Sequence, residues 1–577
     1  MEECMLRQII LCLCLGLMSS SPALELLHDT PARSHVTHGL HGVVSAQEQR
    51  ASQVGIQILQ VGGNAVDAAV ASAFALMVTL PRAGSLGGGG FAMLALQADQ
   101  YQPRFIDFRE IAPGRASPAM MLNSQGEIDS DLIRRSWLSV GVPGNVAGLC
   151  YLENHFGKLS LARVMRPAIT MAQEGFVVKP YLANTLHHYR PMLIQNKATQ
   201  KMLSHADGRE YQFGDIMRRP DLARSLQLIA EQGSDVFYKG QLAEALVASS
   251  DQGGGILCLE DLAHYQVIER RPIQGVVGHA LIYAAPPPSS GGIALIQTLK
   301  ILQLLNIGAN GTLQNTALSF HTMAEVFNRV FLDRNRYIAD PNFVNIPTGE
   351  LLSPAYLHKL AKNLNAHQHV QSKYLTEKKP GFTEGKNTTH LSVVDHNGSM
   401  VALTYSINDS YGSGITVPGT GILLNNTMLD FTLKPPVKGE VSAVLGIRNV
   451  IEPYKRPLSS MTPIIVFNRS KVPWLASGSP GGPKIITTVS QLLINLMLYN
   501  MPLSEAVQAP RIHTQLFPDV LLVESGISPD TIHLLSKMGH DVQLSRSMGS
   551  LQSVMHTPDG LVGFSDTRRA GAGVATY

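Results

Sequence analysis

Asn387-Thr388-Thr389-His390 is the stretch that decides the fold, because the residues after it alternate between strand and turn signals. An apolar run at residues 391–394 leads to a turn at Asn397-Gly398 and then to a second run of strand-forming residues, 400–406. Two such runs around a glycine-containing turn predict a β-hairpin. By itself, a threonine pair entering a strand indicates only that sheets favour β-branched residues.

The length of the hairpin loop decides whether two hydroxyl groups meet. With a three-residue loop, 396–398, and Gly398 in the left-handed region, Thr388 lies opposite Ser406 on the same face. A two-residue loop shifts the register by one residue and puts them on opposite faces.

Seven further motifs surround this hairpin. Downstream are GILLNN at 421–426 with Asp430-Phe431 shortly after it, KRPLSSM at 455–461, and GSPGG at 478–482. Upstream are GGNAVDA at 62–68, GSLGGGGF at 84–91, DFRE at 107–110 and PSSGG at 288–292. Together and in this order they resemble the gamma-glutamyltransferase family of N-terminal nucleophile hydrolases, over nearly the whole chain.

The resemblance implies a fold and a division of the chain. The expected fold class is α+β, a four-layer αββα sandwich that two pieces of one precursor build jointly. The precursor would cut itself between Asn387 and Thr388, giving a large subunit (24–387) and a small catalytic subunit (388–577) that stay together as a heterodimer. Composition and periodicity alone predict only a mixed α and β protein.

The nucleophile of such an enzyme would be Thr388. A threonine hydroxyl is weakly nucleophilic near neutral pH, but a free α-amino group at a new chain terminus, with a pKa of about 7.7 to 8, takes its proton. Thr388 is therefore expected to be inert until the 387–388 bond breaks. The family has a threonine where this chain has Ser406, which keeps the hydroxyl group and lacks only the methyl group.

Gly481-Gly482 is the candidate oxyanion hole. It precedes Pro483 and an apolar pattern of helical spacing, so it places two backbone N–H groups at a helix amino terminus, where negative charge is favoured. The alternative is a turn that merely begins a helix. In the family, the matching glycines bind the oxyanion.

Recognition of a γ-glutamyl group requires partners for its α-carboxylate and its α-ammonium group. A carboxylate calls for arginine and hydroxyl donors, and an ammonium group calls for carboxylate and amide oxygens. The resemblance implies that Arg109, Ser459 and Ser460 bind the carboxylate. It implies that Asn408 and Asp430 bind the ammonium group.

Two features depart from the family pattern. Thr427 stands where the family usually has Gln or Glu, so we expect weaker or water-mediated ammonium binding there. Residues 434–454 match a lid loop, but no aromatic residue lies between Thr432 and Pro453 to act as a gate. A lid that closes less tightly favours water over an acceptor amine, which predicts more hydrolysis than transfer.

The amino terminus reads as an export signal, residues 1–23. Arg7 precedes a short apolar run, 9–18, and Ser21-Pro22-Ala23 is a plausible cleavage site. Ten apolar residues are too few to span a bilayer, and no later run of 18 is present, so we expect a periplasmic or secreted protein without a membrane anchor. The alternative is a buried or disordered amino-terminal segment. Only Cys150 and Cys258 would remain in the mature protein, enough for at most one disulfide.

Composition excludes some classes of partner. The chain has 577 residues, 45% of them hydrophobic, which suffices for one large core or two. A net charge of +3 without a basic run argues against nucleic acid. No cofactor or metal is expected, since HExxH is missing and the pairs His187-His188 and His367-Gln368-His369 lack an acidic residue at ligand spacing. The expected partners are γ-glutamyl substrates such as glutathione, with amino acid or dipeptide acceptors.

Several elements and alternatives complete the prediction. Helices are expected at 48–61, 65–78, 321–337, 484–497 and 529–538. The polar segment 362–387 is expected to be flexible and exposed, as suits a cleavage site. The alternatives are a related amidohydrolase of the cephalosporin acylase or poly-gamma-glutamate depolymerase type, an inactive exported binding relative, and a serine hydrolase of another fold, although no GxSxG motif is visible.

Overall fold

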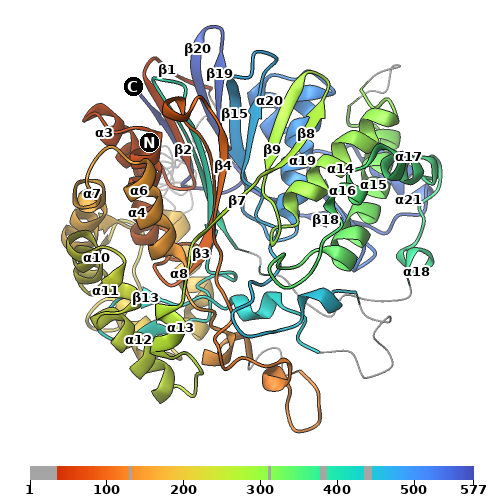
Figure 1. Cartoon of the computed structure of the whole chain (residues 1–577). Coiled ribbons are helices and arrows are strands. Elements are labelled where there is room, and N and C mark those ends of the chain that lie inside the picture. The colour runs from red at the N-terminus through yellow and green to blue at the C-terminus, as the bar shows by residue number, and fades with distance from the viewer. Residues whose placement is uncertain (1–35, 129–132, 309–313, 377–384, 386, 435–444) are drawn as a thin grey trace, which may run out of the picture.

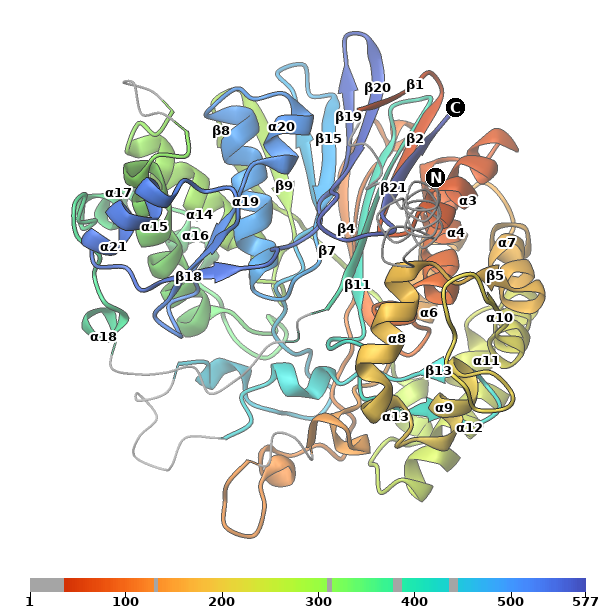
Figure 2. The same cartoon turned by 180° about the vertical axis from the view of Figure 1, so that it is seen from behind.

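Two seven-stranded antiparallel sheets stack face to face in the middle of the molecule, and helices cover both outer faces (Figure 1). This arrangement is seen in a computed structural model that describes residues 36–128, 133–308, 314–376, 385, 387–434 and 445–577. The predicted α+β fold with four αββα layers is confirmed. Figure 2 shows the same layers from behind.

Each sheet mixes strands from before and after residue 388. Sheet 1 contains, in spatial order, β1 (Thr37–Gly39), β20 (Gly560–Ser565), β19 (Gln552–Thr557), β15 (Pro473–Gly478), β14 (Ile464–Phe467), β9 (Ala280–Ala284) and β8 (Ile273–Val277). Sheet 2 contains β21 (Gly573–Thr576), β2 (Gly42–Ala46), β10 (Thr389–Asp395), β11 (Met400–Ser406), β3 (Gly89–Ala95), β4 (Pro103–Phe108) and β7 (Ile268–Arg270). The predicted hairpin, β10 and β11, therefore lies inside sheet 2, between β2 and β3.

Helices cover the two outer faces as separate groups. On sheet 2 lie α3 (Gln49–Gln60), α4 (Ala65–Thr79) and α6 (Asn145–Phe156), with α7 (Leu161–Glu174), α8 (Pro180–Leu193), α9 (Lys197–Leu203), α10 (Pro220–Gln232), α11 (Asp235–Tyr238), α12 (Gln241–Gln252) and α13 (Leu259–Ala263) on that side. On sheet 1 lie α14 (Gly291–Leu304), α15 (Ala317–Tyr337) and α19 (Lys484–Met497), with α16 (Thr348–Leu351), α17 (Pro354–Lys362), α18 (Ser372–Leu375), α20 (Leu503–Gln508) and α21 (Pro529–Lys537) on that side.

The remaining strands form short sheets, and Tyr577 pairs with residues near the first described strands. The short strands are β5 (Phe176–Val177) with β6 (Ile216–Met217), β12 (Thr416–Val417) with β13 (Ile422–Leu423), and β16 (Ile512–His513) with β17 (Leu521–Glu524) and β18 (Val542–Ser545). At the end of β21, the Tyr577 carbonyl oxygen accepts hydrogen bonds from the Leu40 and His41 amides at 3.0 and 2.8 Å. This contact places residue 577 beside the first described strands.

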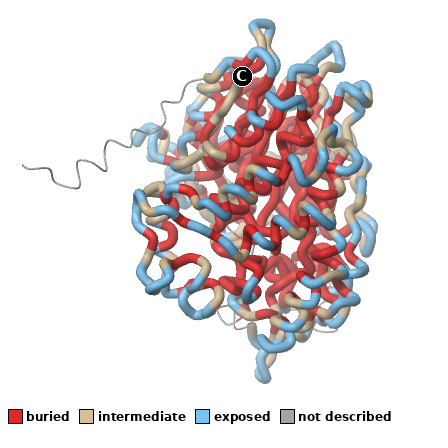
Figure 3. Tube along the Cα trace, turned by 90° about the vertical axis from the view of Figure 1, so that its left-hand side faces the viewer, coloured by how far each residue is buried: buried red, intermediate tan, exposed pale blue. Residues whose placement is uncertain are grey.

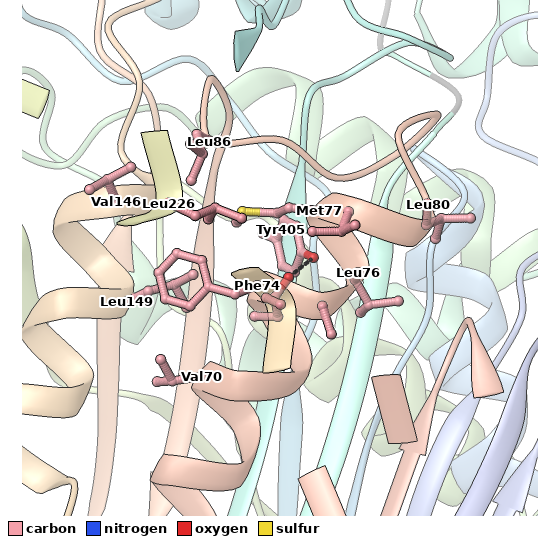
Figure 4. Close-up of a cluster of buried hydrophobic side chains, with 14 of the residues drawn as sticks. Val70, Phe74, Leu76, Met77, Leu80, Leu86, Val146, Leu149, Leu226 and Tyr405 are labelled. Atoms are coloured by element: carbon pink, nitrogen blue, oxygen red, sulfur yellow. Dashed lines mark hydrogen bonds between the residues drawn. The ribbon is translucent and has the colours of Figure 1, made fainter. Parts of the chain in front are cut away.

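Helix α4 explains how the core beneath the hairpin is filled. All 15 of its residues are buried, because sheet 2 lies on one side of it and further helices lie on the other. Asn64 and Asp67 of the GGNAVDA motif form a capping box that begins the helix. Figure 4 shows Phe74 of this helix among apolar side chains, with the Tyr405 hydroxyl of β11 donating to the Ala73 carbonyl at 2.9 Å. This hydrogen bond attaches β11 to helix α4, which covers that face of sheet 2.

The hairpin has the three-residue loop. Asp395 pairs with Ser399, Gly398 has a φ of 76°, and Thr389 pairs with Tyr405, so Thr388 lies opposite Ser406 as the three-residue alternative predicts. Every residue of both strands is buried, and Figure 3 shows buried residues running through the middle of the molecule inside an exposed surface. Burial on both faces of the sheet explains why the apolar residues Val393 and Val394 follow one another in β10.

The predicted helices are confirmed, with α15 beginning at Ala317, four residues earlier than expected. The expectation of an exposed approach to the cleavage site is wrong at its end, because Gly385 and Asn387 are both buried. Residues 377–384 and 386 lie outside the described part, as do the predicted signal segment 1–23 and lid residues 435–444. Cys150 and Cys258 are free thiols. Within the described residues, no helix is long and apolar enough to cross a membrane.

Candidate active site

Thr388 and Ser406 meet at the end of the hairpin opposite its loop. The Thr388 hydroxyl donates to Ser406 Oγ over 3.5 Å, and the Ser406 hydroxyl donates to the Asn387 carbonyl oxygen at 2.7 Å. The Asn408 amide in turn donates to Ser406 Oγ at 2.8 Å. The hydroxyl pair thus lies next to the 387–388 peptide bond, whose cleavage is a prediction from the family resemblance.

Asn387 is fixed on both its main chain and its side chain. Its amide donates to the Asn408 carbonyl oxygen at 3.0 Å, and its Oδ1 accepts from Arg82 at 2.8 Å and from Arg569 at 3.2 Å. Its Nδ2 donates to Ser410 Oγ. Sequence reasoning missed Arg82, Arg569 and Ser410, because they come from three distant segments and belong to none of the motifs.

The two arginines also set the local charge. Burial and the neighbouring Arg82 cation lower the pKa of Arg569 to about 10. Nearby positive charge disfavours a second cation, so these groups would favour the neutral form of an α-amino group on Thr388. That neutral form is the one that accepts a proton.

His390, two residues after Thr388, is a core side chain. Its ring nitrogens contact Thr404 Oγ1 at 2.7 Å and Ser392 Oγ at 3.0 Å. Burial lowers the pKa of His390 to about 3, so the ring is neutral at physiological pH. With both nitrogens engaged, His390 is not placed as a base for Thr388.

The two glycines of the candidate oxyanion hole connect β15 to α19. Gly481 has a φ of 139° and Gly482 a φ of 60°, and helix α19 begins at Lys484. The two glycines therefore lie at the amino terminus of a helix, as predicted. Gly482 lines the cavity beside Thr388, whereas Gly481 is half-buried and is not among the lining residues.

Arg109 is a buried cation, 2% exposed, held between two carboxylates. It pairs with Glu110 at 3.1 Å and with Asp430 at 2.5 Å, and it donates to the Leu458 carbonyl oxygen at 3.2 Å. Burial acts to lower the pKa of Arg109, but the charges of Glu110 and Asp430 outweigh it and raise the pKa. The Arg109 Nε atom has no hydrogen-bond partner among the described residues, which leaves one buried donor available.

Ser459 and Ser460 lie on a loop that the PSSGG motif supports. The Ser459 amide donates to the Pro288 carbonyl oxygen at 3.0 Å, and Ser290 Oγ donates to the Ser459 carbonyl oxygen at 2.9 Å. Arg334 donates to Ser460 Oγ at 3.1 Å. The motif thus holds the backbone of Ser459, and Arg334 holds the side chain of Ser460.

These residues surround one small cavity. Its volume is about 20 Å³, enough for roughly one water molecule. It is lined by Arg109, Gly385, Thr388, Ser406, Asn408, Asp430, Ser459, Ser460, Met461, Gly482 and Ile485. Eight of the ten predicted site residues are in this lining, and Gly481 and Thr427 are not. A larger groove of about 740 Å³, along residues 268–273 and 341–348, contains none of them.

Gly385 fills part of this cavity. Its amide donates to Asp430 Oδ1 at 3.3 Å, and a Cβ atom at this position would come within 1.9 Å of Asn408 Oδ1. The backbone just before the cleavage site therefore occupies the place where Asp430 and Asn408 are expected to meet an ammonium group.

Thr427 is fully buried beside this cavity and is engaged elsewhere. Its hydroxyl donates to Asn425 Oδ1, and its Oγ1 atom lies next to Gly141. In the structure, Thr427 therefore binds Asn425, and its role in ammonium binding stays a prediction.

The chain's relatives agree with this arrangement. A family model described as gamma-glutamyltranspeptidase matches residues 51–576. The chain belongs to the gamma-glutamyltranspeptidase family. It is 42% identical over 535 residues to the glutathione hydrolase proenzyme of Escherichia coli (strain K12), covering 92% of this chain and 91% of that protein. It is 40% identical over 538 residues to the glutathione hydrolase proenzyme of Pseudomonas aeruginosa, covering 92% and 94%.

Among solved structures, the cephalosporin acylase from Bacillus halodurans superposes with a TM-score of 0.83 at 26% identity. The alignment covers 97% of this chain and 98% of that one. The gamma-glutamyltranspeptidase family thus shares its fold with an acylase, so the choice of substrate depends on the residues around the cavity.

The cavity of this transpeptidase family member offers one carboxylate and no imidazole or thiol among its described lining residues. Elsewhere, the structure brings acidic groups to histidines that the sequence analysis set aside. His187 contacts Glu210 at 3.0 Å, and His369 contacts Glu325 at 2.6 Å and Asp519 at 3.1 Å. Each pairing joins distant segments, so spacing along the chain could not reveal it.

Proposed function

We propose that the chain is a self-cleaving γ-glutamyl acyltransferase and hydrolase in which Thr388 is the nucleophile and glutathione is a donor. The observation that carries the proposal is the chain of contacts from the Thr388 hydroxyl to Ser406 Oγ and from the Ser406 hydroxyl to the Asn387 carbonyl oxygen, beside a cavity lined by Arg109 and Asp430. The relatives named glutathione hydrolase proenzyme support the choice of donor.

Maturation would begin with attack of Thr388 Oγ on the carbonyl carbon of Asn387. The peptide C–N bond breaks, the Thr388 nitrogen takes up the hydroxyl proton, and an ester joins Asn387 to Thr388 Oγ. Water then hydrolyses the ester, leaving a carboxylate on Asn387 and a free α-amino group on Thr388. Ser406 stabilises the developing oxyanion, because its hydroxyl already donates to that oxygen.

Catalysis by the processed enzyme would repeat this chemistry on the substrate. The α-amino group takes the Thr388 hydroxyl proton, Oγ attacks the γ-amide carbonyl carbon, and the departing amine, cysteinylglycine from glutathione, receives the proton. Gly481 and Gly482 would donate N–H groups to the oxyanion. Water or an amino acid or dipeptide acceptor then takes the γ-glutamyl group from the ester.

Donor binding would reuse the polar groups around the cavity. Arg109, Ser459 and Ser460 would bind the α-carboxylate, and Asn408 and Asp430 would bind the α-ammonium group, with Thr427 contributing weakly. Because Gly385 occupies this place and only about 20 Å³ is open, the uncut chain has no room for a γ-glutamyl group. The precursor would therefore be inactive as a zymogen until the segment ending at Asn387 moves away.

An acylase function is the alternative that the solved Bacillus halodurans protein brings forward. Asp430 argues against it, because a buried carboxylate suits a substrate with an α-ammonium group and opposes an acyl chain without one. A matched pair of substrates tests this point: γ-glutamyl-p-nitroanilide and glutaryl-p-nitroanilide differ only in the α-amino group. We expect the chain to prefer the γ-glutamyl compound and Asp430→Asn to reduce the preference.

The experiment that tests the proposal is amino-terminal sequencing of the purified chain beside Thr388→Ala. We expect two bands from the parent, with the smaller one beginning at Thr388, one band from the variant, and turnover of glutathione by the parent only. A parent that remains one band would overturn self-cleavage. Two bands with turnover of the glutaryl but not the γ-glutamyl compound would establish the acylase alternative.

Two measurements test the remaining expectations: the amino-terminal sequence of the larger band, and the ratio of hydrolysis to transfer. A large subunit beginning at residue 24 would support a cleaved export signal. The ratio of hydrolysis to transfer, measured with glycylglycine as acceptor, tests the lid hypothesis. A strong transpeptidase would contradict the expectation that a lid without an aromatic gate favours water.

A further inference from the structure

Three imidazoles and a carboxylate meet on the far side of sheet 1, outside the cavity lined by Thr388. His321 and Glu325 lie one turn apart on α15, His369 lies beyond α17, and His540 lies beyond α21. His321 and Glu325 are fully buried, and His540 is 7% exposed. A site of this kind joins residues from both sides of position 388.

The ligand atoms converge at short distances. One nitrogen of His321, one of His540 and one carboxylate oxygen of Glu325 all lie within 4.8 Å of one another. His321 Nδ1 and His540 Nε2 are 2.8 Å apart. Tetrahedral zinc, with Zn–N bonds of about 2.0 to 2.1 Å, holds two nitrogens roughly 3.3 Å apart, so the rings would separate by about half an ångström.

Neighbouring residues hold His321 and Glu325 by hydrogen bonds, as the residues around a metal site hold its ligands. His321 Nε2 lies 2.9 Å from the Asn365 carbonyl oxygen, which only accepts, so this nitrogen carries the proton and Nδ1 presents a lone pair. Arg329 and His369 hold the two Glu325 oxygens at 2.7 and 2.6 Å. Each carboxylate oxygen has a second lone pair available for another partner.

Charged side chains act on this cluster in both directions. Glu325 supplies a negative charge at the cluster, and Asp519 supplies a second one behind His369, at 3.1 Å from its ring. Arg329, at 2.7 Å from Glu325, brings a positive charge that would partly oppose a dication.

We propose that His321, His540 and Glu325 form a site for a divalent transition metal of the zinc class. Two imidazoles and one carboxylate are a ligand set that Zn²⁺ accepts, with a fourth position left for water. His321 and Glu325 precede the 387–388 bond, and His540 lies after it. The metal would therefore fasten the two subunits to each other; this last consequence alone rests on the proposed self-cleavage.

The test uses the full chain after removal of metal with a chelator and dialysis. On addition of ZnCl2, we expect one equivalent of zinc to remain after gel filtration and the thermal unfolding midpoint to rise, because a ligand of the folded state stabilises it. His540→Gln should weaken zinc binding by more than about tenfold. His533→Gln, which alters an exposed histidine on α21 seven residues earlier, should bind zinc as the parent does.

Two outcomes would overturn the proposal: a parent that retains no zinc, or equal retention by His540→Gln. If His540→Gln fails to fold, the parent alone decides through Co²⁺, whose visible d–d absorption should appear on binding and disappear when zinc is added. Thr388→Ala should bind zinc like the parent. Zinc binding by this uncut variant separates the metal site from the proposed catalytic function.

Discussion

Ser406 links the proposed nucleophile, Thr388, to the bond that it would break. Its hydroxyl donates to the Asn387 carbonyl oxygen while its Oγ accepts from the Thr388 hydroxyl and the Asn408 amide. When Thr388 Oγ attacks that carbonyl, negative charge develops on an oxygen that already has a hydrogen-bond donor. No rearrangement is needed to stabilise it, which is the condition under which such donors are most effective.

Ser406→Ala should therefore slow self-cleavage by about 10² to 10³-fold, the usual effect of removing one oxyanion donor. A time course on a denaturing gel after rapid purification measures this rate. Ser406→Thr retains the hydroxyl group and should cleave at close to the parental rate. Cleavage of Ser406→Ala at the parental rate would contradict the role given to this hydroxyl.

Single residues were predictable where a short-range rule fixed them. The hairpin itself was predictable, and turn rules reduced its register to two alternatives, of which the structure has the one that places Thr388 opposite Ser406. The hydrogen bonds from Arg82 and Arg569 to Asn387 were not predictable. Those residues lie about 300 and 180 positions away, and nothing in the sequence distinguishes them from surface arginines. The motif residues Arg109 and Asp430 were predictable as site residues, but their mutual ion pair was not.

At the scale of elements, the GSLGGGGF motif shows why a turn and a strand require glycine. Gly88 and Gly90 lie against the backbone of β11, and a Cβ atom on Gly88 would come within 2.1 Å of the Ser406 carbonyl oxygen. Close packing against the backbone of β11 thus requires glycine at these two positions. It lets β3 approach the strand that carries Ser406.

Gly88→Ala should lower the free energy of unfolding by about 1 to 3 kcal/mol, as overpacking does, and should also slow self-cleavage because β11 must shift. Gly349→Ala is the matched control. Gly349 lies in helix α16 with nothing within 4 Å of an added Cβ atom, and alanine favours helix, so its stability should be unchanged or slightly higher. Urea unfolding of the uncut Thr388→Ala background compares the two; equal stability would refute the steric argument.

Helices α4 and α6 bring two buried carboxyl groups, Asp67 and Glu153, close enough for their charges to interact. Burial and the charge of Asp67 raise the pKa of Glu153 to about 9. Between about pH 4.5 and 9 the folded chain therefore holds a proton that the unfolded chain has released, so stability falls as pH rises through this range. Glu153→Gln should flatten this slope.

Unfolding midpoints across that pH range measure the effect. Glu244→Gln, which alters an exposed carboxylate on α12, should leave the parental slope intact. A slope that survives in Glu153→Gln would show that another group carries the proton.

Elements were predictable when their periodicity was long and regular. Helices α3, α4 and α19 were placed within one residue, because each has a clear apolar pattern between caps or turns. The strands β3, β4, β8 and β9 were not predicted. β8 and β9 have only five residues each, and β3 begins inside a glycine run that is typical of a loop. Pairing with β11 and β4 makes residues 89–95 a strand, and a local sequence pattern does not show which distant segments pair.

At the scale of the whole molecule, the two pieces divided at residue 388 are interleaved. In sheet 2, β10 and β11 of the second piece lie between β2 and β3 of the first, and in sheet 1, β14 of the second pairs with β9 of the first. Separation would break backbone hydrogen bonds at every one of these boundaries and expose both faces of the buried strands. The pieces are therefore parts of one folding unit.

We accordingly expect the two fragments to co-elute after cleavage in size-exclusion chromatography, at high salt as well as low, since burial and strand pairing hold them. Denaturant should separate them only in the same transition that unfolds the chain. Elution of residues 388–577 as a free fragment in native buffer would contradict this picture. The four-layer architecture itself was predictable through resemblance alone, since nothing local in the sequence specifies how two sheets stack.

The contact of Tyr577 with Leu40 and His41 makes a circular permutation of the chain possible. A circular permutant that joins residue 577 to residue 36 through a short linker and opens the backbone before Thr388 keeps every strand pairing of both sheets. Its first native residue is Thr388, so removal of an initiator methionine would expose the α-amino group directly. Such a chain would acquire its base during synthesis, and it would make peptide-bond rearrangement and substrate turnover separable steps in this scaffold.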